Sequence, residues 1–132
     1  MRDIPGAGYV LVVMALVFSI FGSGFATSTN ILNIGVQSSV LLLLSLPMTL
    51  IIMSEGLDLS IGAVLSLSGV VLAVLLSGGR ALTTALVAAL GVGLTFGVGN
   101  GLLVAVLGIP AFVATLGTLG IVQGVALVVT DG

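Results

Sequence analysis

The sequence predicts an all-α, polytopic transmembrane helical bundle with about five spans. Of its 132 residues, 59% are hydrophobic and 5% are charged, and the mean hydropathy is +1.50. Soluble domains carry about a quarter of their residues as charged side chains, so this chain has too few to cover a surface that faces water. Its apolar runs are also about as long as the 20 residues needed to cross a hydrocarbon core of roughly 30 Å. We therefore expect the lipid bilayer to be its main surrounding.

Turn signals divide the chain, taken as one transmembrane domain (1–132), into successive apolar segments. The predicted spans are residues 9–25, 36–53, 59–76, 81–107 and 111–129. The first span follows a polar start in which Pro5 suits the beginning of a helix. A cleaved signal peptide with Arg2 as its basic region is the alternative. Because four more spans follow, an uncleaved first helix explains the same residues more simply.

The connection to the second span, residues 26–33, is polar and rich in Thr and Asn. It is expected to be an external loop or a short interfacial helix, with these side chains placed to cap the helix that follows. The second span contains Pro47, which removes one backbone hydrogen bond and predicts a kink. The third span is expected to stop at residues 77–80, Ser-Gly-Gly-Arg.

The fourth span, residues 81–107, is longer than a straight crossing needs, so it is expected to tilt or bend. Glycines recur in it and in the fifth span, which follows a Gly-Ile-Pro turn signal. Two small-xxx-small pairs predict close helix packing: these are Gly97 with Gly101, and Gly120 with Gly124. A hinge is the alternative role for such glycines.

Between the second and third spans lies a short acidic break, residues 54–60. A charge of Glu55 or Asp58 at bilayer depth would cost about 2.5–3.5 kcal/mol on insertion scales. The break is therefore expected to be a turn at, or just inside, a membrane surface. Asp58 or Ser60 could cap the third helix by accepting hydrogen bonds from its free amides. A role in gating or in subunit contact is the alternative for these residues.

Polar side chains within the last two spans are candidates for a substrate path. Asn100 lies among glycines in an apolar helix, so its amide must either hydrogen-bond a neighbouring helix or face a water-filled route. Thr115, Thr118 and Gln123 present the same choice. Because Thr can satisfy its hydroxyl on its own helix backbone, Gln123 is the better path candidate of these three.

Composition excludes several chemistries. The chain has no Lys, His, Cys or Trp, so it has neither the P-loop lysine nor imidazole or thiolate ligands for a metal. We expect no catalytic residue, metal or cofactor, because the acids after the first few residues (Glu55, Asp58 and Asp131) include none in mid-span. A net charge of −2 without a basic cluster argues against a nucleic-acid partner.

Three ordered motifs carry a resemblance to a known family. Residues 54–69, SEGLDLSIGAVLSLSG, resemble the signature GGIDLSVGSVLALSG of the permeases of sugar-type ABC importers, which include bacterial ribose, arabinose, xylose and autoinducer-2 permeases. Residues 100–105 (NGLLVA) and 109–119 (IPAFVATLGTL) are similar to two further motifs of that family. Two departures stand out: Glu55 where the family often has Gly, and Gln123 where many members have Arg.

The resemblance implies a multi-pass permease subunit in the bacterial inner membrane that imports a monosaccharide or a similar small polar solute. Its partners would be a second permease subunit, a cytoplasmic ATP-binding subunit and a periplasmic solute-binding protein. The N-terminus would be cytoplasmic, which the charges leave open because Arg2 and Arg80 fall on opposite sides of five spans. The chain resembles the N-terminal half of a ten-span permease. The alternative is a small polytopic scaffold, or a non-functional permease fragment, without transport of its own.

Overall fold

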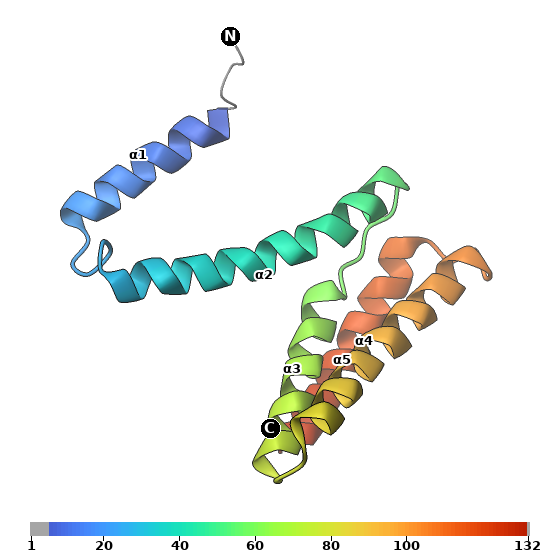
Figure 1. Ribbon diagram of the computed structural model, residues 1–132. Helices are drawn as coiled ribbons and strands as arrows, with labels where there is room; N and C mark the ends of the chain where they lie inside the picture. Colours follow the sequence, from blue (N-terminus) through green and yellow to red (C-terminus); the bar gives the residue numbers. More distant parts are fainter. Residues whose placement is uncertain (1–5, 132) are drawn as a thin grey trace. The chain divides into compact units, whose positions relative to one another are not determined.

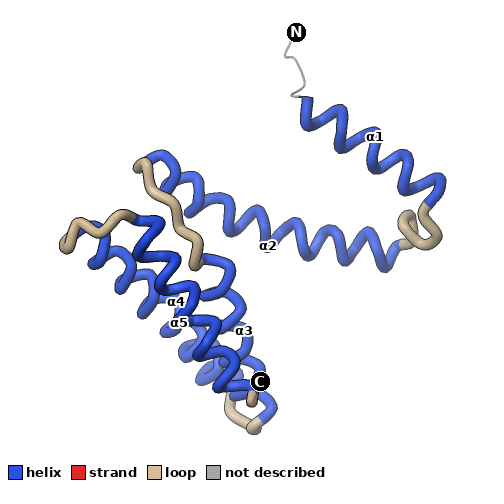
Figure 2. The backbone as a smooth tube through the Cα atoms, turned by 180° about the vertical axis from the view of Figure 1, so that it is seen from behind, coloured by secondary structure: helices blue, strands red, loops and turns tan. Residues whose placement is uncertain are grey.

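The computed structural model describes residues 6–131. Its helices, shown in Figure 1, are α1 (Gly6–Phe21), α2 (Ser28–Met53), α3 (Ile61–Ser77), α4 (Leu82–Ala105) and α5 (Ala111–Thr130). Figure 2 shows helices and loops, and no strand, over these residues. The predicted all-α class is thus confirmed. The expected helix start at Pro5 and the orientation argument from Arg2 fall outside the described residues.

The chain divides into two compact units at Ser45 and Leu46, within α2. In the first unit, α1 ends at Phe21, earlier than the predicted boundary at residue 25. The amide of Gly22 still donates to the Phe18 carbonyl at 2.9 Å, but Gly24 has a φ of +87°, a conformation that few residues other than glycine adopt. The helix therefore stops at this glycine-rich turn.

The segment 26–33 is not a separate loop, because α2 begins at Ser28. Thr27 caps this helix: its Oγ1 accepts a hydrogen bond from the Asn30 amide at 3.4 Å. The Asn30 side chain in turn donates to the Phe25 carbonyl at 2.7 Å. The predicted capping is confirmed for Thr, whereas the Asn30 side chain bonds the turn before the helix, and α2 begins eight residues before the predicted span.

The second unit contains α3, α4 and α5, which pack against one another as an antiparallel bundle (Figure 1). The turns between them are short and use left-handed glycines, Gly79 with a φ of +75° and Gly108 with a φ of +68°. At the end of α3, the Arg80 amide donates to the Leu75 carbonyl and the Gly79 amide to Leu76. This is the Schellman pattern of helix termination, so the predicted stop at residues 77–80 is confirmed.

Three helices within residues 6–131 are long and apolar enough to cross a membrane: α2, α4 and α5. The other two, α1 and α3, have 16 and 17 residues, at the short end of the range for a spanning helix. Helix α4 has 24 residues and is shorter than the predicted span 81–107. The assignment of five spans stays a prediction.

The bundle of α3–α5 has a small interior that is as much polar as apolar. Its buried apolar residues are Leu67, Ala85, Ala114 and Val122, and its buried polar residues are Ser60, Asn100, Thr115 and Thr118. Large aliphatic side chains lie mostly on the outside. Small residues and interhelical hydrogen bonds, rather than large apolar side chains, hold helices together in membranes, and this distribution fits that pattern.

Candidate functional site

The site is built around the acidic break between α2 and α3. Asp58 Oδ1 accepts two hydrogen bonds from Ser60, one from the backbone amide at 2.8 Å and one from the hydroxyl at 2.6 Å. Ser60 occupies the N-cap position of α3, but no side chain bonds the first-turn amides there. The predicted capping of α3 by Asp58 or Ser60 is therefore wrong, because the two side chains are used on each other.

Asn100 of α4 connects this break to α5. Its Nδ2 donates to the Ser60 hydroxyl at 2.9 Å, and its Oδ1 accepts a hydrogen bond from the Thr118 hydroxyl at 2.5 Å. Ser60 is fully buried, and Asn100 and Thr118 are 8% and 7% exposed. Of the two roles predicted for Asn100, hydrogen bonding to neighbouring helices is thus observed.

Thr115 of α5 holds the backbone of the break. Its hydroxyl lies 2.8 Å from the Ala111 carbonyl of its own helix and 3.2 Å from the Leu57 carbonyl, to either of which it can donate. The same oxygen accepts a hydrogen bond from the Leu59 amide at 3.2 Å. The contact with the Ala111 carbonyl is the predicted bond to the helix's own backbone. The contacts with Leu57 and Leu59 hold the break against α5, a tertiary role that the sequence did not predict.

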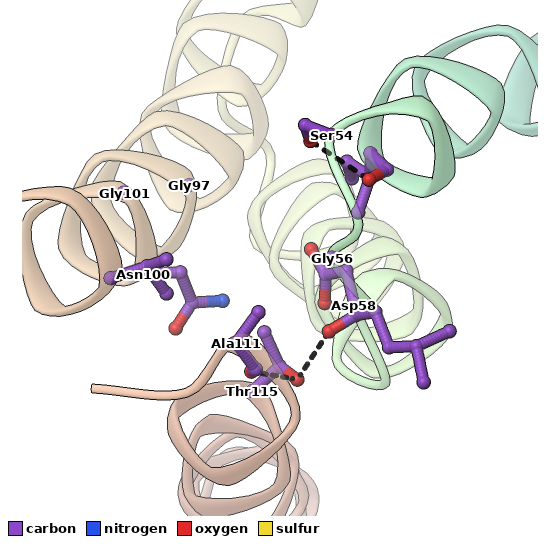
Figure 3. A pocket seen from close by; sticks show the side chains of 11 residues that line it. Ser54, Gly56, Asp58, Gly97, Asn100, Gly101, Ala111 and Thr115 are labelled. Carbon is purple, nitrogen blue, oxygen red and sulfur yellow. Dashed lines mark hydrogen bonds between the residues drawn. The ribbon is translucent and has the colours of Figure 1, made fainter. Parts of the chain in front are cut away.

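A cavity of about 280 Å³ lies between the break, α4 and α5. Figure 3 shows Asp58 on one side and Asn100 on the other, with the amide of Asn100 turned toward Asp58, while Thr115 lies at the base. Asn100 and Thr115, two of the three path candidates, thus share one cavity with Asp58. The arrangement offers a carboxylate, an amide and hydroxyls to a bound molecule.

A second, smaller cavity of about 130 Å³ shares Asp58, Gly97 and Asn100 with the first. Gly93 lines the smaller cavity, Gly101 the larger one, and Gly97 both. These glycines are spaced by four residues, so they lie on one face of α4. We call this set, Gly93, Gly97 and Gly101, the glycine face.

The predicted helix packing at Gly97, Gly101, Gly120 and Gly124 is not found within residues 6–131. A Cβ added at any of them would meet no atom of a neighbouring element within 4 Å. Gly97 and Gly101 instead leave space for the cavities. The one close glycine contact at the site is that of Gly56, whose added Cβ would lie 3.2 Å from Ile51 and 3.7 Å from the Ala111 side chain.

Gln123, the third path candidate, lies apart from this site. It lines a separate hollow with Val70, Ala126, Leu127 and Thr130. At about 100° per residue, Gln123 lies about 140° around α5 from Thr118, so it does not share the face that carries Thr115 and Thr118. The structure therefore brings Asn100 and Thr115 together and leaves Gln123 out.

Glu55 is exposed and ends α2. Its φ is +59°, its amide donates to the Ile52 carbonyl, and the next amide, of Gly56, donates to Ile51. This is again the Schellman pattern, with Glu55 at the left-handed position that usually holds glycine. Glycine would suit this position because of its backbone conformation, and the side-chain hydrogen bonds described above for the site do not include Glu55.

Thr118 was considered beside Thr115 and Gln123 and ranked below Gln123, and the structure places it in a buried hydrogen bond with Asn100. Its signal was the spacing of Ala111, Ala114, Thr115, Thr118 and Val122, small or β-branched residues at three- and four-residue intervals, which mark one helix face. No group of three or more His, Cys, Asp or Glu side chains that could hold a metal occurs within residues 6–131. The arrangement can bind a small molecule through hydrogen bonds.

Comparison with known proteins gives a family and several relatives. Residues 30–132 match the family described as branched-chain amino acid transport system / permease component. The autoinducer 2 import system permease protein LsrC of Escherichia coli (strain K12 / DH10B) is 44% identical over 96 residues, which are 73% of this chain and 28% of the relative. The D-allose transport system permease protein AlsC of Escherichia coli (strain K12) is 40% identical over 124 residues, 90% of this chain and 38% of the relative.

A third relative is the probable ABC transporter permease protein y4mJ of Sinorhizobium fredii (strain NBRC 101917 / NGR234), which is 42% identical over 103 residues, 78% of this chain and 31% of the relative. The matched regions are thus between 28% and 38% of these relatives, and the chain spans less than half of their length. No solved structure matches. The family match extends over most of the chain, and it follows that the chain belongs to the branched-chain amino acid transport system / permease component family, among relatives that include sugar and autoinducer permeases.

Proposed function

We propose that the chain is part of a permease subunit of an ABC importer and forms part of the translocation path for a monosaccharide or a similar small polar solute. The observation that carries the proposal is the cavity beside the acidic break. Asp58, Asn100 and Thr115 converge on it from three segments of an otherwise apolar bundle. Ionisable and polar groups are costly inside a membrane protein, and they usually mark a substrate pathway.

The size and chemistry of the cavity support a small, hydrogen-bonding solute. Its volume of about 280 Å³ lies at the lower end of small-molecule sites, which run from about 300 to 1,000 Å³. Its polar groups are well suited to the hydroxyls of a sugar. The names of two relatives, a D-allose permease and an autoinducer 2 permease, also favour a small hydroxylated solute.

The glycine face provides the other wall of the path. Because Gly93, Gly97 and Gly101 carry no side chain, α4 leaves open both cavities that meet at Asp58 and Asn100. In this proposal the solute passes along the glycine face by alternating access, without covalent chemistry. Gln123, at a separate hollow, is at most a secondary contact.

The proposal includes the setting of such a subunit. The chain would be a multi-pass protein of the bacterial inner membrane. It would work with a second permease subunit, a periplasmic solute-binding protein and a separate cytoplasmic subunit that hydrolyses ATP.

Uptake by the native host tests the proposal. A strain deleted for this gene would be supplied with labelled pentoses and hexoses, D-ribose and D-allose among them. We expect it to lose uptake of at least one sugar and to regain it with a wild-type gene copy. Unchanged uptake across the panel, together with a stable complex containing the chain, would favour the scaffold alternative. Sequencing past codon 132 would show whether further spans are encoded in the same or an adjacent frame.

A further inference from the structure

One carboxylate oxygen of Asp58 accepts hydrogen bonds from the protein, and the other is open to a bound molecule. Oδ1 accepts both hydrogen bonds from Ser60. No donor within residues 6–131 is placed on Oδ2, and no buried side-chain oxygen of these residues lacks a partner. Oδ2 is therefore reachable by a molecule of solvent size at the cavity that Asp58 lines.

The hydrogen bonds behind Asp58 fix its orientation. The Asn100 amide donates to Ser60 Oγ, so the Ser60 proton is directed to Asp58 Oδ1. The Asn100 carbonyl is held in turn by Thr118. Because Ser60 is fully buried, water cannot substitute for this arrangement. Three elements of the fold thus hold one carboxylate oxygen inward and present the other to the cavity.

The charges around the two cavities limit what this oxygen can accept. Among the residues lining them, Asp58 carries the only formal charge, and none is basic. A carboxylate accepts hydrogen bonds from hydroxyl groups strongly, whereas it repels a carboxylate or phosphate of a solute. The site therefore favours neutral molecules with several hydroxyls over anions.

We propose that Asp58 Oδ2 is the acceptor for hydroxyl groups of a neutral, polyhydroxylated solute in the cavity, and that Ser60 is the positioning residue that aims it. This inference rests on the proposed function and adds a specificity-determining residue to it. Asp58 would then distinguish a neutral sugar from an acidic sugar of the same size.

Single-cysteine labelling tests the inference, because the chain has no cysteine of its own. Gly97→Cys places a reporter at both cavities, and Gly124→Cys is the matched control away from them; an added Cβ meets nothing within 4 Å at either position. The full chain would be labelled with a maleimide in host membranes that contain the complete importer. The probes are D-ribose, D-allose, D-gluconate and L-leucine.

We expect a neutral sugar to slow labelling of Gly97→Cys and not of Gly124→Cys, with no protection by D-gluconate. Asp58→Asn keeps an acceptor for the Ser60 bonds but replaces the free oxygen with an amide. It should raise the half-protecting sugar concentration about tenfold or more, the loss expected for a hydrogen bond to a charged group. It should also reduce the discrimination against D-gluconate, which a purely structural change would not do.

The outcomes separate the inference from the proposed function. Equal protection in wild type and Asp58→Asn, or equal protection by D-gluconate, would overturn the role of Asp58 while leaving the permease function supported. Sugar uptake without any protection at Gly97→Cys would overturn this cavity as the solute site. Absence of both sugar protection and sugar uptake would overturn both the role of Asp58 and the proposed permease function. If Asp58→Asn also changes the labelling rate of Gly124→Cys, that variant has disturbed the fold. Ser60→Ala then becomes the test variant, and the inference fails unless Ser60→Ala raises the half-protecting sugar concentration by the same factor of about ten.

Discussion

The side-chain amide of Asn100 donates a hydrogen bond to the hydroxyl of Ser60 at 2.9 Å, across 40 positions of sequence. This bond joins the C-terminal part of α4 to the acidic break that precedes α3. Both residues are buried, and the same amide group faces the cavity with Asp58. Structural and path-lining roles thus meet in one residue.

Replacing Asn100 with leucine should leave membrane insertion intact and impair uptake by the assembled importer. Insertion survives because leucine is favoured in membranes. Loss of the bonds to Ser60 and Thr118 should lower the free energy of unfolding by about 1–2 kcal/mol. Thr118→Val is the comparison variant: it removes only the bond to Asn100 Oδ1 and lines neither cavity described above, so it should destabilise less and reduce uptake less than Asn100→Leu. Uptake and unfolding in mild detergent are the measurements, and unchanged uptake in Asn100→Leu would remove this residue from the path.

Filling the glycine face should block transport without disturbing the fold. A leucine at Gly97 would enter open space at both cavities, since no neighbouring atom lies within 4 Å of an added Cβ. We expect uptake to fall at least about tenfold while stability changes by less than about 1 kcal/mol. Gly124→Leu, equally open but away from the cavities, should transport normally. Normal uptake in Gly97→Leu would show that the solute takes another route.

Glycine at position 55 should stabilise the chain. Glu55 has a φ of +59°, a conformation that costs an ordinary residue about 1–2 kcal/mol. Part of the gain is offset by the greater freedom of glycine in the unfolded chain, so Glu55→Gly should raise the unfolding free energy by about 1 kcal/mol. Glu55→Gln loses the charge but keeps the strain, and thermal unfolding should place it near wild type. Equal stabilisation by both variants would mean that loss of the charge, not relief of the backbone strain, raises the unfolding free energy.

Alanine at position 56 should have the opposite effect. Its Cβ would lie 3.2 Å from the Ile51 carbonyl oxygen and side chain, and such crowding typically costs about 1–3 kcal/mol. Gly62→Ala, in the first turn of α3 with open space around it, should instead be neutral or stabilise by up to about 1 kcal/mol. The melting temperatures of the two variants are compared, and a Gly56→Ala chain as stable as Gly62→Ala would contradict the close packing of Gly56 against Ile51.

Much of the fold could be predicted because its signals are local. Apolar length and composition predict helices, and residues 77–80 stop α3 where their glycines indicate. The first helix ended early because a left-handed glycine at 24 decides its boundary. The second began early because Thr27 provides a cap that hydropathy does not register.

The site was predictable only in part. A polar residue in an apolar helix attracts notice by itself, so Asn100 and Thr115 were found. The sequence pattern could not place Gln123 and Thr118 at different sites, or show that Gly97 and Gly101 border open space. Both depend on how each helix is rotated about its axis relative to its neighbours. A helix that is apolar on all sides gives no sequence signal for that rotation.

The sequence by itself determined an apolar, all-α membrane chain, its main breaks and its family motifs, because helix formation and hydropathy depend on residues close together in the chain. Only the tertiary structure decided that Ser60 serves Asp58 rather than the end of α3, that Asn100 reaches both Ser60 and Thr118, and that the glycine face lines cavities. The bonds of Asn100 join residues 40 and 18 positions apart. Both they and the cavities at the glycine face depend on how the helices are rotated against one another, which no local pattern encodes.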